Sequence, residues 1–216
     1  IWSSLVGSEM CIRDRLFVYR NFFPLFMKVS CANFDRTGDI MIIPVFKDFD
    51  KAPNNTTVGL DRGPSIAVKA AAASDSISGK VGESLSVWTK GCTVIFIGVG
   101  EKGKLTHKVA RDTGAKCLAS LSKELGNNIV IRFTSGWSTE NMTAFAEGMM
   151  LRDYQFDKYQ KKDEENNHDG WILECQAHDR HLEVLSESIE KASLVTTGVH
   201  LSRDLANEPA NRLYPE

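Results

Sequence analysis

The stretch Cys92-Thr-Val-Ile-Phe-Ile-Gly-Val-Gly100 decides the fold that we expect for this chain. Its apolar run predicts a β-strand. The preceding Lys90-Gly91 indicates a hairpin turn, so the strand expected at 84–88 should pair with it antiparallel. After it, residues 104–125 have helical spacing, and Gly126 indicates the end of that helix.

The alternation of strands and helices continues toward the C-terminus. A buried strand is predicted at 128–133, a helix opened by Thr139 and Glu140 follows, and a last strand is predicted at 171–175. The mixed-sign run 158–170 between them is typical of a solvated loop. Alternating strands and helices indicate an α/β fold with a mixed, largely parallel sheet flanked by helices.

The N-terminal half adds two strands and a helix to this plan. A short strand is predicted at 28–34, and the continuous apolar run 39–46 predicts a buried strand. Pro44 interrupts that run, which argues for a strand end or an edge strand. The alanine-rich segment from Asp61 predicts a short helix with Pro64 in its first turn.

Composition excludes several classes of protein. The chain has 216 residues, 42% of them hydrophobic and 25% charged, which is ordinary for a globular domain with appendages. Its net charge of −2 gives no electrostatic argument for a nucleic-acid partner or an anionic membrane. The five cysteines are scattered and form no C-x-x-C motif, so we expect free thiols and a cytoplasmic location.

Residues 1–26 differ from the rest of the chain. Arg20 and Pro24 interrupt a short apolar run that falls far short of the ~20 residues of a membrane span. A signal peptide would need an unbroken apolar region, which Arg20 prevents. We therefore interpret 1–26 as a non-native or disordered leader, with a targeting segment or native structure as alternatives, and we expect the native sequence to start at Met27.

A G-x-G-x-x-G pattern, Gly98-Val-Gly100-Glu-Lys-Gly103, lies between a predicted strand and a predicted helix. In dinucleotide-binding folds such glycines let a pyrophosphate approach the backbone amides. The acidic residue expected about 20 positions later is absent, and the predicted hairpin breaks the first βαβ unit. A dinucleotide-binding loop is therefore disfavoured but stays open, beside a phosphate pocket of macro-domain type and a ligand-free tight turn, as an interpretation of these three glycines.

No catalytic set stands out elsewhere in the sequence. His178 and His181 have i, i+3 spacing, with Glu174 and Glu183 nearby, but this is not the H-E-x-x-H arrangement of zinc proteases. We interpret the pair as a polar helix start. The methionines of the 139–150 segment are expected in the core.

A long amphipathic helix is predicted over 181–207. The prediction rests on one apolar stripe at helical spacing, which consists of Leu185, Ile189, Ala192, Val195 or Thr196, and Val199. About 25 residues at ~1.5 Å each would span roughly 37 Å. Such a helix either folds over the sheet or leaves the domain as a strut toward another one.

The end of this helix carries a motif at fixed spacing. Arg203-Asp204-Leu205-x-Asn207-x-Pro209-x-Asn211 is followed by Pro215-Glu216, where the prolines break and then restart a helix. This pattern resembles the junction of leucyl (cytosol) aminopeptidases, which joins an N-terminal α/β domain to a C-terminal di-metal catalytic domain. The resemblance extends more weakly back to about Met27.

The resemblance implies the organisation of the chain. Residues 27–180 would form the N-terminal domain, whose fold in this family is similar to macro domains, and 181–216 would form the linker helix and junction to a missing catalytic domain. The parent would be a homo-hexameric cytoplasmic hydrolase of peptides with two divalent metal ions, manganese or zinc. The family's catalytic and metal-binding residues lie beyond the junction, so none is assigned to this chain, which alone should be inactive.

Two other classes of function stay open from the sequence. One is a stand-alone macro-type module that binds ADP-ribose or another phosphate ligand at Gly98–Gly103. The other is an interaction domain that docks through the helix 181–207.

Overall fold

The structure is a computed structural model of the chain. It describes residues 27–32, 38–47, 65–66, 68–70, 77–121, 128–133, 136–156, 158–159, 172–177, 179–209 and 212. The predicted leader, Gly126 and most of the charged loop 158–170 lie outside these residues.

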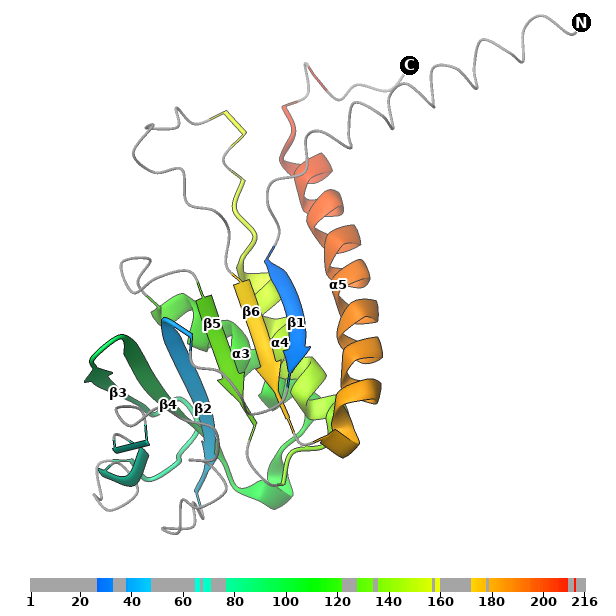
Figure 1. Cartoon of the computed structure of the whole chain (residues 1–216). Helices are drawn as coiled ribbons and strands as arrows, with labels where there is room; N and C mark the ends of the chain where they lie inside the picture. The colour runs from blue at the N-terminus through cyan, green and yellow to red at the C-terminus, as the bar shows by residue number, and fades with distance from the viewer. Residues whose placement is uncertain are drawn as a thin grey trace, which may run out of the picture.

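One six-stranded sheet organises the described residues (Figure 1). Its strand order is β1 (Lys28–Ala32), β6 (Ile172–Gln176), β5 (Asn128–Arg132), β2 (Ile40–Phe46), β4 (Cys92–Gly100) and β3 (Ser84–Thr89). Neighbouring strands are parallel except for β3 and β4, which form the predicted antiparallel hairpin. The predicted mixed, largely parallel α/β sheet is therefore confirmed.

Pro44 lies inside the sheet and not on an edge strand. Pro44 was expected at a strand end or on an edge strand, and the edge-strand alternative is wrong because β2 lies between β4 and β5 in the sheet. However, β2 pairs with β5 only from Ile40 to Ile42. Pro44 therefore lies beyond the ladder with β5, where its missing N–H removes no bond from that pairing.

Three long helices accompany the sheet: α3 (His107–Ser120), α4 (Thr139–Arg152) and α5 (Asp179–Asn207). The Thr106 hydroxyl caps α3 by accepting from the amide of Val109, and the Ser138 hydroxyl caps α4 in the same way. A 3₁₀ turn, η2 (Lys102–Lys104), precedes α3. The helix predicted over 104–125 is shorter than expected, because the backbone becomes extended at Leu121.

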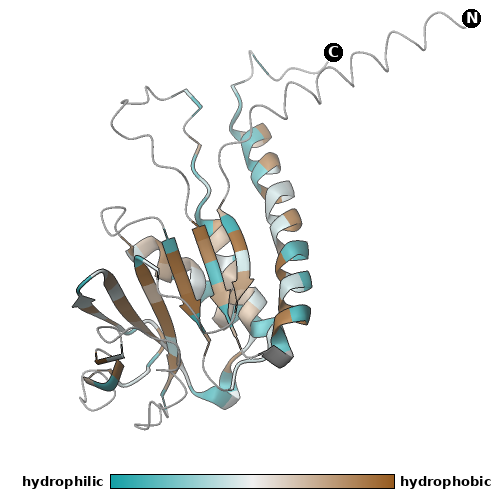
Figure 2. Ribbon diagram, viewed as in Figure 1, coloured by the Kyte–Doolittle hydropathy of each residue, from teal (hydrophilic) through white to brown (hydrophobic). Residues whose placement is uncertain are grey.

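Two apolar clusters form on the opposite faces of the sheet, as strand geometry requires. On β2, Ile40 and Ile42 belong to the cluster that packs on the three helices, whereas Met41 and Ile43 belong to the other cluster. Val68 of the alanine-rich segment, which is helical at 65–66 and 68–70, packs in the second cluster. Figure 2 shows the strands as the most hydrophobic part of the fold.

α5 packs against α4 and against β1. Leu185 and Ile189 are buried in the core, and the stripe continues through Thr196, which is 4% exposed, and not through Val195, which is 60% exposed. The C-terminal end of α5 extends beyond the ends of the strands (Figure 1). No helix in the described part of the chain has the length and apolar character that crossing a membrane requires.

Candidate functional site

The glycine turn at the end of β4 is built by close packing against the segment before β3. A Cβ atom at Gly98 would lie 2.1 Å from the carbonyl oxygen of Lys80, so only glycine fits there. The amide of Gly98 donates to the carbonyl of Glu83 at 2.8 Å, and the amide of Gly100 donates to Gly79 at 2.9 Å. These amides are therefore engaged within the protein and do not point at an open phosphate position.

A cavity of about 310 Å³ beside this turn is lined by Lys47, Lys80 and Lys104 and by one carboxylate, Glu101. Glu101 follows Gly100, and its carboxylate contacts Lys104 at 2.8 Å and Lys47 at 3.6 Å. The hydrogen bond and the charge of Lys104 lower the pKa of Glu101, with a smaller effect of Lys47. Gly103 lies in η2 with no atom within 4 Å of its would-be Cβ, so packing does not require a glycine there.

We expect no measurable heat when ADP-ribose or inorganic phosphate is titrated into the 216-residue chain in a calorimeter. The amides of Gly98 and Gly100 already donate to Glu83 and Gly79, so neither is available to a phosphate. Lys47 and Lys104 already contact the carboxylate of Glu101, so a phosphate would have to compete with that carboxylate for them. A saturable heat that is lost in Gly100→Val would contradict this expectation and favour the phosphate-binding alternative.

The structure describes only one member of the histidine pair. His178 lies outside the described residues, and the Nδ1 atom of His181 lies 3.4 Å from the hydroxyl of Thr139 at the start of α4. In the described part of the chain, no three His, Cys, Asp or Glu side chains gather where they could hold a metal ion. The methionines of α4, Met142, Met149 and Met150, are buried in the core as predicted.

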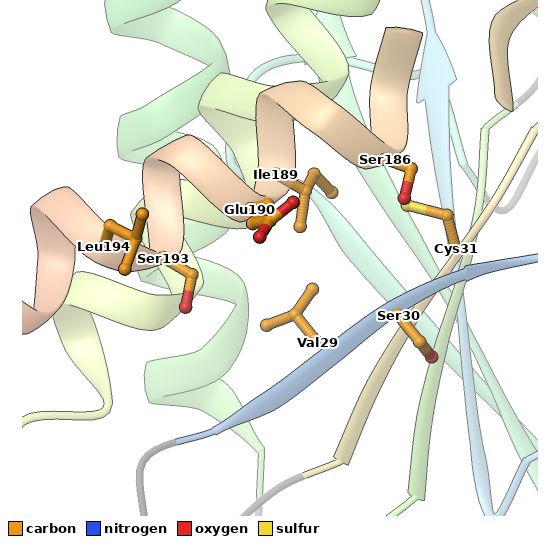
Figure 3. A pocket seen from close by; sticks show the side chains of 8 residues that line it. All are labelled: Val29, Ser30, Cys31, Ser186, Ile189, Glu190, Ser193 and Leu194. Carbon is orange, nitrogen blue, oxygen red and sulfur yellow. The ribbon is translucent and has the colours of Figure 1, made fainter. Parts of the chain in front are cut away.

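A groove of about 310 Å³ lies between the edge strand β1 and the middle of α5 (Figure 3). Val29 and Cys31 line it from the strand, and Ile189 and Leu194 line it from the helix. Burial, with a smaller contribution from the charge of Glu174, raises the pKa of Cys31 to about 11. The thiol is therefore protonated at neutral pH and does not supply a nucleophile to the groove.

The junction residues of α5 converge on the segment that follows α4. The hydroxyl of Tyr154 donates to Oδ1 of Asp204 at 3.0 Å and accepts from Nδ2 of Asn207 at 3.1 Å. The sequence singled out Asp204 and Asn207 but not Tyr154, because no local pattern links residues 50 positions apart. Pro209 of the same motif is also among the described residues, whereas Asn211, Pro215 and Glu216 lie outside them.

One family model matches this chain. It is the N-terminal domain of the cytosol aminopeptidase family, and the match covers residues 42–163, which is more than half of the chain. The match includes the hairpin β3–β4, the glycine turn, α3, β5, α4 and Tyr154.

Curated relatives and a solved structure agree with this match. The chain is 27% identical over 186 residues to a probable cytosol aminopeptidase of Clostridium perfringens, covering 82% of the chain and 36% of the relative. It is 30% identical over 162 residues to a probable cytosol aminopeptidase of Aquifex aeolicus, and this match covers 72% of the chain and 31% of the relative. A mutant of tomato leucine aminopeptidase has the same fold, with a TM-score of 0.65 and 20% identity over 88% of this chain and 40% of that chain. The chain thus spans about a third of the length of the curated relatives.

Proposed function

Since this chain belongs to the cytosol aminopeptidase family through its N-terminal domain, we propose that it is the non-catalytic N-terminal part of a leucyl aminopeptidase. The parent enzyme would remove N-terminal amino acids from peptides. The observation that carries this proposal is the match of the family's N-terminal domain over residues 42–163. In this proposal, 1–26 is a leader, 27–180 is the α/β domain, and 181–216 is the linker and junction.

The catalytic centre of the parent is proposed to lie beyond residue 216. The described residues offer no cluster of side chains that fits a metal ion, so we assign no metal ligand and no catalytic step to them. In the parent, two divalent ions, manganese or zinc, would activate a water molecule and polarise the scissile carbonyl. The relatives are about three times as long as the matched segment, which leaves room for a separate catalytic domain.

The proposed role of this part is to shape access to the catalytic domain and to connect to it through α5. Helices α3, α4 and α5 cover one face of the sheet, and α5 runs directly into the junction residues Asp204, Asn207 and Pro209. The parent is proposed to be a cytoplasmic homo-hexamer. The names of the matched relatives support the cytoplasmic location.

We expect the purified 216-residue chain to release no p-nitroaniline from leucyl-p-nitroanilide, with or without Mn²⁺. Its described residues provide no metal site that could activate water. A full-length cytosol aminopeptidase assayed under the same conditions serves as the positive control. Metal-dependent turnover by the 216-residue chain would overturn the proposal that the chemistry lies downstream.

The coding sequence downstream of residue 216 gives an independent check. If the proposal is correct, it encodes a domain rich in aspartate and lysine that completes a di-metal site. A stop codon directly after Glu216 in the genome would contradict it and would favour a stand-alone binding or interaction domain.

A further inference from the structure

The end of α5 is attached to the segment that follows α4 through Tyr154. This residue lies two positions after the last residue of α4, and its hydroxyl bridges Asp204 and Asn207 with hydrogen bonds of 3.0 and 3.1 Å. Asp204 and Asn207 are three residues apart and therefore lie on the same face of the helix. One hydroxyl group thus holds the last turn of α5.

The ring of Tyr154 holds the preceding turn of α5. The ring of His200 packs against it with a centroid distance of 5.2 Å, and the guanidinium of Arg203 lies 5.4 Å from its centroid. Arg203 also donates to the carbonyl oxygen of Leu151 at 3.0 Å, near the end of α4. The contacts of the ring and of the hydroxyl of Tyr154 therefore restrain both the rotation of α5 about its axis and its displacement from α4.

A second attachment lies directly after the helix. The carboxylate of Glu208 accepts hydrogen bonds from the ammonium of Lys158 and the hydroxyl of Tyr159. Its side chain is 8% exposed, although it belongs to the first residue after α5. The hydrogen bond from Lys158, followed by that from Tyr159, lowers the pKa of Glu208, so the carboxylate is ionised at neutral pH.

We propose that Tyr154, Lys158, Tyr159, Asp204, Asn207 and Glu208 form a junction clasp that sets the direction in which the polypeptide leaves the N-terminal domain. Tyr154 and Glu208 are its positioning residues. This inference rests on the proposed function, in which a catalytic domain follows the junction. It adds that the orientation of that domain is fixed by contacts within the N-terminal part and not by the helix alone.

The clasp is needed because the end of α5 has few other attachments. The buried side chains of α5 are Leu185 and Ile189 in the core, and then Thr196 and His200, so none of the described residues of α5 after His200 is buried. The side chains of Ser202, Ala206 and Asn207 are exposed, and the helix end extends beyond the strands (Figure 1). An isolated helix end frays readily. Without the clasp, the junction would therefore sample many directions.

Amide hydrogen exchange on the 216-residue chain, read by mass spectrometry, tests the clasp. We expect Tyr154→Phe to raise exchange of the amides of 201–208 about tenfold, because two hydrogen bonds to the hydroxyl are lost. Exchange of the amides of 185–192 should stay unchanged, because Leu185 and Ile189 hold that part. A general loss of stability would raise exchange in both parts alike.

Two further variants separate the clasp from general packing. Asp204→Asn keeps an acceptor oxygen for Tyr154 and should preserve protection of 201–208, whereas Asp204→Ala should lose it. Glu147→Gln weakens the two hydrogen bonds from Arg111, which lie between α3 and α4, and should leave α5 unaffected.

The clasp would be disproved by unchanged exchange of 201–208 in Tyr154→Phe, or by an equal rise along the whole of α5. Neither result bears on the proposed function, which the aminopeptidase assay and the downstream coding sequence test separately. Conversely, hydrolysis of leucyl-p-nitroanilide by the 216-residue chain would overturn the proposed function without changing what hydrogen exchange shows about the clasp.

Discussion

Gly148→Ala is expected to lower the free energy of unfolding by about 2–3 kcal/mol, because it overfills the contact between α3 and α4. A Cβ atom at Gly148 would lie 2.0 Å from the carbonyl oxygen of Arg111 on α3. That oxygen belongs to helix backbone and cannot rotate away, so the helices must separate. The higher helix propensity of alanine, worth up to about 1 kcal/mol, offsets only part of this cost. Urea denaturation followed by tryptophan fluorescence measures the change.

Gly198→Ala is the matched control for this prediction. Gly198 lies in α5 with no atom within 4 Å of a would-be Cβ, so the substitution adds helix propensity without a clash. We expect it to stabilise the chain by about 0.5–1 kcal/mol. Equal stabilisation in both variants would mean that α3 and α4 are not packed as closely as the structure has them.

Gln176→Leu is expected to cost about 3 kcal/mol of stability, because it removes an oxygen that accepts two hydrogen bonds from a buried guanidinium. Arg132 and Gln176 are register partners on β5 and β6, and neither side chain is exposed. The side-chain oxygen of Gln176 accepts two hydrogen bonds from Arg132, at 2.7 and 3.0 Å. Leucine fills a similar volume but offers no acceptor to the charge. The midpoint and slope of urea denaturation check this prediction.

Glu174→Gln is the control for Gln176→Leu, because it also changes a polar side chain of β6 but keeps its hydrogen bond. It keeps an oxygen that can accept from the side-chain amide of Gln176, as Glu174 now does at 2.9 Å. We expect its cost to stay below about 1 kcal/mol. If Gln176→Leu costs no more than Glu174→Gln, the other interactions of Arg132 are enough to solvate its charge.

The local elements of the fold could be predicted because each one is encoded in a short stretch. The continuous apolar run of β4 and the Lys90-Gly91 turn before it specified a strand and a hairpin, and both are observed. The helix boundaries were less accurate. α3 ends at Ser120 although the sequence continues with helical spacing, because the backbone becomes extended at Leu121, whose amide donates to the carbonyl of Leu118.

The candidate site could be predicted only in part. The junction motif on α5 could be recognised from its fixed spacing. The contact between Asp204 and Tyr154, and that between Glu208 and Lys158, could not, because each joins residues 50 positions apart. The glycine turn had the spacing of a nucleotide-binding loop. Only the packing of Gly98 on Lys80 and the occupied amides distinguish it from one.

The sequence by itself determined the alternation of strands and helices, the antiparallel hairpin, and the motif that points to the aminopeptidase family, since periodicity and spacing are local properties of the chain. Only the tertiary structure decided that β2 lies inside the sheet with Pro44 beyond the β5 ladder, that Gly98 and Gly148 are required by close contacts, and that Tyr154 holds the end of α5. These features depend on distances between segments that are far apart in the chain, and no local pattern of residues encodes such distances.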